Sequence, residues 1–378
     1  MEQIQKDYDL IFPERYFLII DNKNNRKFVT TNMKRANISK KNINLTFFNG
    51  KHLNTYWDIT DAANYTQITS KEFNSEEHFE DEEIEYSNEK ILNASNKEIY
   101  QSEKSQKLTD EEINELKKTI TNKDELIKAI KDNNSSMEKR TLLSQEKYIK
   151  KKTQKYKNLI WVTDTTLFNI VETFFIFDPK SINYLRMDSI STMLVNSNFL
   201  PEANTLIYED TNNILTHAYA MRTHFDAKVY HVYSDKIANK NMNLFNFSNR
   251  QKSIIAYIEM KQLTDKKSFG YEMLNKKFNQ FFSNLVICAK SDETIPSIFV
   301  QLFDYLKYSG NVVVFAKDME VLVTIDKYLT ENKLGIDTKI IETIAREYQV
   351  LPLRTHPMMN HKGFSGYVLT SYKTVPSD

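Results

Sequence analysis

Glu209 and Asp210 are the first residues in this sequence at which catalytic chemistry could be sought, because they follow the apolar run Thr205–Tyr208. Carboxylates at the end of a buried strand can hold ribose hydroxyls or act as a general acid and base. A nucleotide or nucleoside cofactor at such a turn also needs glycines, which let the backbone approach the ligand. The stretch Leu206–Asn213 contains none, and no glycine occurs from Lys51 through Phe269. Neither a dinucleotide fingerprint nor a phosphate loop can therefore be placed.

A structural role explains the two acids at this turn better. Without glycines, the side chains of Tyr208 and Asn212 should crowd the space that a cofactor needs. We therefore expect Glu209 and Asp210 to cap the helix that follows the turn.

Other catalytic or metal-binding sets are missing from the sequence. The seven histidines lack metal-ligand spacing, and no Ser/His/Asp set can be assigned. We interpret His224 and His231 as ordinary polar residues of the sheet region. The single cysteine, Cys288, lies in the apolar run Leu285–Ala289, where a thiol behaves as a small buried hydrophobe. Disulfides and cysteine-based metal sites within the chain are thereby excluded, and we expect no metal.

A cluster of lysines is the better indication of a ligand. The net charge is only +1, but Lys147–Lys157 holds six lysines in eleven positions, whereas Glu72–Glu89 holds nine acidic residues. Nucleic acids bind to local rows of cations rather than to the global charge. The alternative is that the lysines form a solvated helix face.

The 378 residues, 40% of them hydrophobic, suffice for two domains. Residues 1–70 alternate in short β-like runs, which predicts a small antiparallel sheet or barrel with strands at Tyr16–Ile20, Lys27–Thr31 and Asn44–Phe48. Residues 71–107 are acidic and poor in apolar residues, and we expect them to form a flexible insertion.

Residues 108–157 are predicted to form a helical, basic connecting segment. Thr109 and Glu112 have the spacing of a capping box, and two further helices are expected over Lys123–Lys131 and Ser144–Tyr156. The last of these should carry the lysines outward, with Tyr148, Ile149 and Tyr156 facing inward.

Residues 158–378 alternate between apolar strand-like runs and helical segments. This α/β pattern is typical of a doubly wound, Rossmann-type parallel sheet. A helix is expected over Ile295–Tyr308, and Tyr348–Leu353 with Phe364–Thr370 should form an antiparallel hairpin at the edge of the sheet. The other predicted strands are Thr205–Tyr208, Lys228–Tyr233, Leu285–Ala289 and Val312–Phe315.

Membrane insertion is not expected. No run approaches the roughly 18 apolar residues that a span needs, and Met1–Asp9 lacks the apolar core of a signal peptide. With one cysteine, the chain suits a reducing compartment, the cytosol or the nucleus.

Four stretches carry a resemblance to a known family. In one-letter code they read LTDEEI at 108–113, SQEKYIKKK at 144–152, LRMD at 185–188, and REYQVLP at 346–352 continuing as RTHP at 354–357. With these stretches the chain resembles the non-catalytic subunit of eukaryotic tRNA (adenine-N1)-methyltransferase. The resemblance extends over nearly the whole chain and is weakest at 71–107. It implies a small β domain followed by a degenerate methyltransferase-like sheet.

The resemblance also implies the partners. S-adenosylmethionine is expected only on a catalytic methyltransferase subunit. This chain should therefore bind no cofactor and should not be an enzyme by itself. The run Cys288-Ala289-Lys290 agrees, because a catalytic copy should place an acidic residue near there. The pair is expected to assemble as a two-plus-two heterotetramer, to bind tRNA and to reside in the nucleus.

The resemblance points to two groups of tRNA contacts. One is the lysine run, and the other is the Arg-Thr-His-Pro turn, where a guanidinium can pair with phosphate and a histidine can stack on a base. Alternatives stay open: a subunit-interface ion pair for Arg354, bracing of the turn for His356, and ion pairs of Arg346 with Glu347 and of Arg186 with Asp188. The predicted RNA-binding residues are Lys147, Lys150, Lys151, Lys152, Lys155, Arg346, Arg354 and His356.

We therefore expect a subunit that positions the T-loop adenine of tRNA for methylation by its partner. Two other functions remain open at this point. One is a purely structural interaction scaffold, and the other is a self-sufficient methyltransferase with an atypical cofactor loop.

Overall fold

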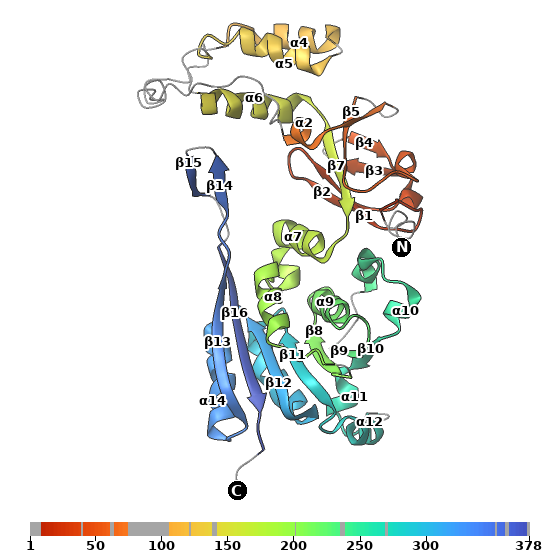
Figure 1. Ribbon diagram of the computed structural model, residues 1–378, viewed down its shortest axis with the longest axis vertical. Coiled ribbons are helices and arrows are strands. Elements are labelled where there is room, and N and C mark those ends of the chain that lie inside the picture. The colour runs from red at the N-terminus through yellow and green to blue at the C-terminus, as the bar shows by residue number, and fades with distance from the viewer. Residues whose placement is uncertain are drawn as a thin grey trace. The chain divides into compact units, whose positions relative to one another are not determined.

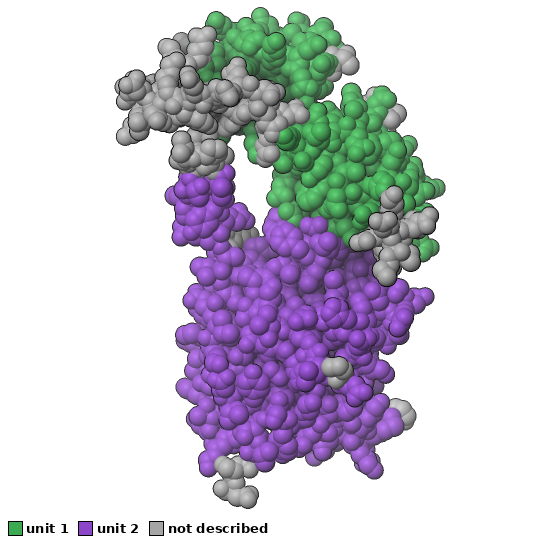
Figure 2. Space-filling view, viewed as in Figure 1, with its two compact units in different colours: residues 1–164 green, residues 165–378 purple. Residues whose placement is uncertain are grey.

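A computed structural model describes residues 9–38, 41–60, 64–74, 106–120, 122–137, 142–200, 202–234, 239–268, 271–351, 354–359 and 363–375. The chain separates into two compact units, residues 1–164 and residues 165–378 (Figure 2). Residues 75–105, which make up most of the expected flexible insertion, lie outside the described residues.

Unit 1 is built on a five-stranded antiparallel sheet in the order β2-β1-β7-β5-β6, with β3 and β4 as a separate pair (Figure 1). The strands are β1 (Phe17–Asp21), β2 (Arg26–Val29), β3 (Arg35–Ile38), β4 (Lys41–Asn44), β5 (Thr55–Ile59), β6 (Tyr65–Ile68) and β7 (Leu159–Asp164). β7 pairs with both β1 and β5. The break between the units therefore follows Asp164. We had expected the α/β domain to begin earlier, at residue 158.

Two of the three strands predicted for the N-terminal sheet are confirmed, as β1 and β2. The third prediction, Asn44–Phe48, is wrong: Leu45–Phe48 forms a 3-10 helix, η2. The side-chain oxygen of Asn44 accepts a hydrogen bond from the Thr46 amide at 3.2 Å. This local bond caps the helix and competes with strand pairing.

The predicted helices of residues 108–157 are confirmed. Thr109 and Glu112 form the complete capping box at the start of α4. Ile113, Leu126 and Ile130 form a small core against which Tyr156 packs. Besides η2, the helices among the described residues of unit 1 are η1 (Thr31–Met33), α2 (Ser70–Asn74), α4 (Asp110–Thr119), α5 (Lys123–Asp132) and α6 (Leu142–Tyr156).

Unit 2 contains a seven-stranded sheet in the order β10-β9-β8-β11-β12-β16-β13. The first five strands are parallel, and β16 runs antiparallel to both of its neighbours. The expected doubly wound sheet is thus confirmed. Its strands are β8 (Thr205–Glu209), β9 (Val229–Tyr233), β10 (Ile255–Glu259), β11 (Phe282–Cys288), β12 (Leu306–Ala316), β13 (Gly335–Ile344) and β16 (Phe364–Lys373).

The helices of unit 2 lie on both faces of this sheet (Figure 1). They are α7 (Leu167–Phe177), η5 (Pro179–Ile182), α8 (Met187–Val195), α9 (Ile214–Arg222), η6 (Asn239–Phe245), α10 (Asn249–Lys252), α11 (Met260–Thr264), α12 (Tyr271–Phe278), η7 (Asp292–Thr294), α13 (Ile295–Leu302), η8 (Phe303–Tyr305) and α14 (Met319–Glu331). The predicted helix over Ile295–Tyr308 ends early, because β12 already begins at Leu306. No helix in the described ranges is both long and apolar enough to cross a bilayer.

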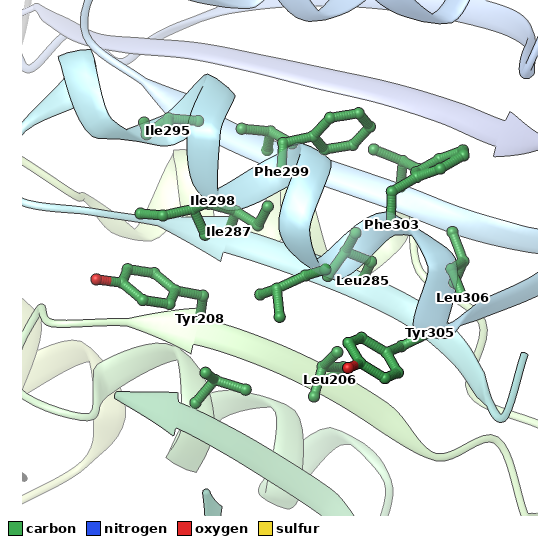
Figure 3. Close-up of a cluster of buried hydrophobic side chains, with 14 of the residues drawn as sticks. Leu206, Tyr208, Leu285, Ile287, Ile295, Ile298, Phe299, Phe303, Tyr305 and Leu306 are labelled. Atoms are coloured by element: carbon green, nitrogen blue, oxygen red, sulfur yellow. The ribbon is translucent and has the colours of Figure 1, made fainter. Parts of the chain in front are cut away.

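The main core lies between the sheet and helices α13 and α14. Leu206 and Tyr208 of β8 pack there with Leu285 and Ile287 of β11 (Figure 3). Tyr208 is 5% exposed. The expectation that Tyr208 crowds the turn after β8 is therefore wrong. Alternation along the strand directs its ring into the core instead.

The C-terminal antiparallel strands are present, but their partners differ from the prediction. Phe364–Lys373 (β16) pairs with β12 and β13 inside the sheet. Tyr348–Leu351 (β14) pairs instead with Arg354–Pro357 (β15) in a separate two-stranded sheet. The chain thus leaves the sheet at the end of β13, forms the narrow hairpin of β14 and β15, and returns as β16 (Figure 1).

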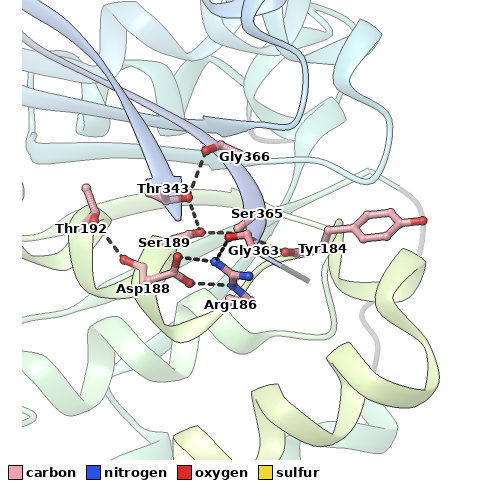
Figure 4. Close-up of polar contacts among 9 residues, drawn as sticks. All are labelled: Tyr184, Arg186, Asp188, Ser189, Thr192, Thr343, Gly363, Ser365 and Gly366. Carbon is pink, nitrogen blue, oxygen red and sulfur yellow. Dashed lines mark hydrogen bonds and ion pairs between the residues drawn. The ribbon is translucent and has the colours of Figure 1, made fainter. Parts of the chain in front are cut away.

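A polar network fastens this hairpin to α8 (Figure 4). Arg186 donates to both carboxylate oxygens of Asp188, at 2.9 and 2.7 Å, and to the carbonyl of Gly363 at 2.7 Å. The hydroxyl of Ser189 lies 2.9 Å from that of Thr343 and 2.6 Å from that of Ser365. The network therefore bonds the start of α8 to β13 and to the start of β16.

Arg186→Ala should lower the free energy of unfolding by about 1.5–3 kcal/mol, because it leaves a half-buried carboxylate and a carbonyl without their charged donor. Arg186→Lys should restore only part of this, since an ammonium cannot form the two-pronged contact. Urea unfolding measures both. The control is Lys339→Ala, which removes an exposed ion pair with Asp337 in the same sheet and should change nothing measurable. A loss for Arg186→Ala no larger than this control would contradict the assigned role.

Candidate functional site

The strand order of the seven-stranded sheet reverses between β8 and β11. In open α/β sheets, ligands bind outside the carboxyl ends of the strands at such a switch point. Glu209 and Asp210 stand at the end of β8, and Ala289 and Lys290 follow β11. This edge is the first candidate site.

Glu209 is fully buried, and its carboxylate caps α9 from the end of the strand. It accepts hydrogen bonds from the amides of Leu215 and Thr216, at 3.2 and 2.6 Å, and from the hydroxyl of Thr211 at 2.8 Å. Burial raises the pKa of Glu209 to about 7 despite these bonds. The predicted capping role is thus confirmed for Glu209, and its oxygens face the protein's own backbone.

Two histidines are buried in this region, and His231 lies beside the Glu209 carboxylate. Burial lowers the pKa of His231 and of His217 to about 4, so both are neutral at pH 7. His231 Nε2 lies 3.0 Å from the Glu209 carbonyl and therefore carries the proton, while Nδ1 accepts from the Thr216 hydroxyl at 2.8 Å. A neutral ring forms no ion pair with the Glu209 carboxylate, although the two approach to 3.9 Å. His231 is structural, as the sequence indicated.

The turn after β8 keeps a backbone conformation that favours glycine. Asn212 and Asn213 have φ angles of 62° and 61°, in the left-handed region that asparagine tolerates better than other side chains. The Asn212 amide donates to the hydroxyl of Ser181 in η5 at 3.0 Å. Side chains therefore stand where a cofactor would need bare backbone.

Polar contacts also join the strand ends across the switch point. Asp210 does not cap α9; it accepts from the Lys290 amide at 2.6 Å and so links β8 to β11. Asn183 donates to the Ala289 carbonyl at 2.6 Å and to Asp292 at 2.9 Å. The other carboxylate oxygen of Asp292 accepts from the amides of Lys317 and Asp318, at 2.9 and 3.0 Å. This edge of the sheet is thus bonded internally.

Metal and thiol chemistry receive no support from the described part of the chain. No three side chains of His, Cys, Asp or Glu come together there as a metal site requires. Cys288 is completely buried, as predicted, and burial raises the pKa of its thiol.

The second candidate site is the lysine run, which lies on α6. Lys150, Lys151 and Lys155 lie three, four and eight residues after Lys147, so the four share one side of the helix. All four are exposed. None of the five predicted lysines forms an ion pair with a described residue.

Two of the lysines lie over aromatic rings instead. Lys152 lies 5.1 Å from the centre of the Tyr148 ring, and Lys155 lies 5.4 Å from that of Tyr156. In both contacts the ammonium nitrogen lies over the ring, and its remaining N–H groups can still meet an anion. At the end of the run, Lys157 is paired with Asp124 at 2.6 Å.

The third candidate is the hairpin. Arg346 is exposed between β13 and β14, and its alternative pairing with Glu347 is not seen among the described contacts. His356 is half-buried, and its Nδ1 lies 2.9 Å from the Pro357 carbonyl, which fits the bracing alternative. Arg354 begins β15, but its side chain lies outside the described residues. The pairing of Arg186 with Asp188 is confirmed. The lysine helix and the hairpin belong to different units, and each is a site by itself.

Sequence reasoning missed Asn183 and Asp292, which close the switch point together with Asp210. They lie more than a hundred residues apart along the chain, and neither belongs to a spacing motif. The paired asparagines at 212 and 213 did carry a signal, because adjacent asparagines in a strand-to-helix turn indicate left-handed backbone.

The pH dependence of stability should reveal the buried carboxylate. Because the pKa of Glu209 is about 7 in the folded chain and near 4.5 when unfolded, its ionisation opposes folding. As the pH rises from about 4.5 to 7, the wild type should lose up to about 3 kcal/mol of stability relative to Glu209→Gln, and no more above that range.

His217 and His231 act in the opposite sense: their contribution is complete above pH 6.5 and is lost as the pH falls towards 4. They are present in both proteins, so the difference between the two urea-unfolding curves isolates Glu209. A difference that does not change between pH 4.5 and 8 would contradict the buried, raised-pKa carboxylate.

Comparison with solved structures supports the fold. An S-adenosylmethionine-dependent O-methyltransferase from Thermotoga maritima aligns over 99% of this chain and 98% of its own, with a TM-score of 0.58 and 10% sequence identity. At that identity the likeness concerns architecture. The fold is therefore methyltransferase-like, as predicted.

Sequence relatives extend over most of the chain. A protein named tRNA (adenine(58)-N(1))-methyltransferase non-catalytic subunit from Dictyostelium discoideum is 26% identical, over 98% of this chain and 81% of the relative. Proteins of the same name from Schizosaccharomyces pombe and Mus musculus are 24% and 21% identical, each over 75% of this chain and over 77% and 74% of the relative. The sequence profile of the Gcd10p family matches residues 11–281. Since that is well over half of its length, the chain belongs to the Gcd10p family.

Proposed function

We propose that this chain is the non-catalytic, tRNA-binding subunit of a tRNA (adenine-N1)-methyltransferase, and that it positions the T-loop adenine for a catalytic partner. The observation that carries this proposal is the similarity over 98% of the chain to a relative named as that subunit. Positioning can contribute several kcal/mol to a reaction without any chemistry by the subunit itself.

The switch point supports the view that S-adenosylmethionine is held only by the partner. The residues present there do not suit a nucleoside cofactor, because Asn212 and Asn213 place side chains in a turn that such cofactors approach through glycine. Asp210, Asn183 and Asp292 also bond to neighbouring backbone across the strand ends.

Two surfaces suit tRNA. The exposed side of α6 presents Lys147, Lys150, Lys151 and Lys155, which can release counterions from phosphates. The second surface is the hairpin, where Arg346 is exposed just before β14 and His356 lies on β15, a strand that Arg354 begins. β14 and β15 form a narrow two-stranded ribbon that can reach an RNA surface.

The catalytic partner needs an interface. Edge strand β13 and the hairpin expose large apolar side chains, with Ile336 57%, Ile344 66% and Val350 74% exposed. Exposed apolar surface along an unpaired strand edge is typical of protein association.

We propose that the complex holds two copies of each subunit and is located in the nucleus. Light scattering of the co-purified complex tests the stoichiometry, and microscopy of the tagged chain tests the location.

Replacing Lys150, Lys151 and Lys152 together by glutamine should weaken tRNA binding by the complex. The slope of log affinity against log salt concentration should shrink by up to about 2–3, because up to three phosphate contacts are lost. Filter binding at several salt concentrations measures both quantities.

The matched control replaces the exposed lysines Lys266, Lys267 and Lys276 of unit 2 by glutamine, which removes the same charge elsewhere. Its salt slope should stay close to that of the wild type. If the α6 variant bound tRNA with unchanged affinity and slope, the purely structural scaffold would be the better description.

Titration calorimetry with S-adenosylmethionine should give no heat of binding for this chain alone and one site for each catalytic subunit in the complex. The catalytic partner without this chain is the control for the number of sites measured in the complex. Micromolar binding by this chain alone would instead support a self-sufficient methyltransferase.

A further inference from the structure

A cavity of about 390 Å³ lies within unit 1, on the second face of the five-stranded sheet. The first face of that sheet carries Ile19, Trp57 and Ile160 into the unit-1 core. Their neighbours Ile20, Tyr56 and Trp161 point to the other side, because side chains alternate along a strand, and all three line the cavity. Its size is in the range of about 300–1,000 Å³ that encloses a small ligand.

The floor of the cavity is one row of residues across four strands. Arg26 of β2 pairs with Ile20 of β1, Ile20 with Trp161 of β7, and Trp161 with Tyr56 of β5. The Trp161 and Tyr56 rings are stacked, with centroids 5.7 Å apart and planes 16° apart, and Phe73 of α2 adds a third ring 5.1 Å from Tyr56. The row therefore passes from a guanidinium to an aromatic surface.

The opposite wall comes from α6. Lys150, Thr153 and Gln154 line the cavity and share one helix face, since they lie three and four residues apart. Lys150 is exposed and Thr153 is buried. Lys150 thus belongs both to the exposed lysines of α6 and to the lining of the cavity.

The polar lining holds two cations and one carboxylate among neutral side chains. Arg26 and Lys150 are the charged donors, and Arg26 is held in place by a hydrogen bond from Nε to the Asn24 side chain at 3.1 Å. The carboxylate of Asp21 also lines the cavity, but it accepts from the amides of Lys23 and Asn25 and from the Asn25 side chain, each at 2.8 Å. Its charge is thereby offset by three donors.

We propose that this cavity binds one unstacked nucleotide of an RNA chain, with the base against Trp161 and Tyr56 and the phosphate at Arg26 and Lys150. Aromatic rings beside a cationic groove are the combination that binds single-stranded nucleic acid. The cavity is too small for a duplex, whereas unpaired bases are what RNA loops offer. This assignment rests on the proposed function, since it names a further contact for the same substrate.

Fluorescence of Trp161 gives a direct test. The chain has two tryptophans, Trp57 and Trp161, and Trp57 is only 5% exposed in the core. In a Trp57→Phe chain, titration with a short single-stranded RNA should quench the emission of Trp161. Adenosine monophosphate is the second probe and should quench only at much higher concentration, because it lacks the neighbouring phosphates that meet α6.

Trp161→Leu should weaken tRNA binding by the complex about 5- to 100-fold, the usual effect of losing one stacked base. Arg26→Gln, which leaves the sheet core intact, should shorten the salt slope by about 1. Arg35→Gln is the matched control: it removes an exposed arginine of the same unit outside the cavity and should leave the Trp161 quenching unchanged.

The outcomes separate this proposal from the broader one. If RNA does not quench Trp161, and if Arg26→Gln and Trp161→Leu bind tRNA as the wild type does, the cavity proposal is overturned while tRNA binding through α6 stands. If the mononucleotide quenches as strongly as the RNA, a free nucleotide is the ligand and the RNA assignment is overturned. If the wild-type complex binds no tRNA, the proposed function itself fails.

Discussion

The carboxylate of Glu209 ties together the parts of unit 2 that meet where the first strand of its sheet ends. It holds the start of α9 through two backbone amides, and the backbone carbonyl of the same residue accepts from the ring of His231 in the neighbouring strand. A buried carboxylate is costly unless donors surround it, and here the donors are the chain's own. The same bonds that complete the fold at this edge turn its polar groups inward, towards the chain's own backbone.

The sequence predicted those elements whose causes are local. The capping box at Thr109, the apolar runs of β8 and β11, and the acid before α9 each depend on a few adjacent residues, and each is found in the structure. The placements of β7 and β16 depend on pairing over long distances. β7 follows β6 by about ninety residues and still completes the N-terminal sheet. No periodicity within a strand reveals which partners it will choose.

The candidate sites divide in the same way. The outward side of α6 could be predicted, because helical spacing alone groups Lys147, Lys150, Lys151 and Lys155. The aromatic and cationic row at Arg26, Trp161 and Tyr56 could not, since it exists only after β2, β1, β7 and β5 are in register. One signal was available: strands 55–59 and 159–164 carry large side chains on both faces, which indicates that a second layer covers the sheet.

The position of β16 also governs the order in which the sheet can form. Because β16 separates β12 from β13, the sheet cannot grow by adding strands in chain order. β13 joins only after β16 has docked, or both dock together as a preformed hairpin. The two outermost strands should therefore form as one cooperative folding element.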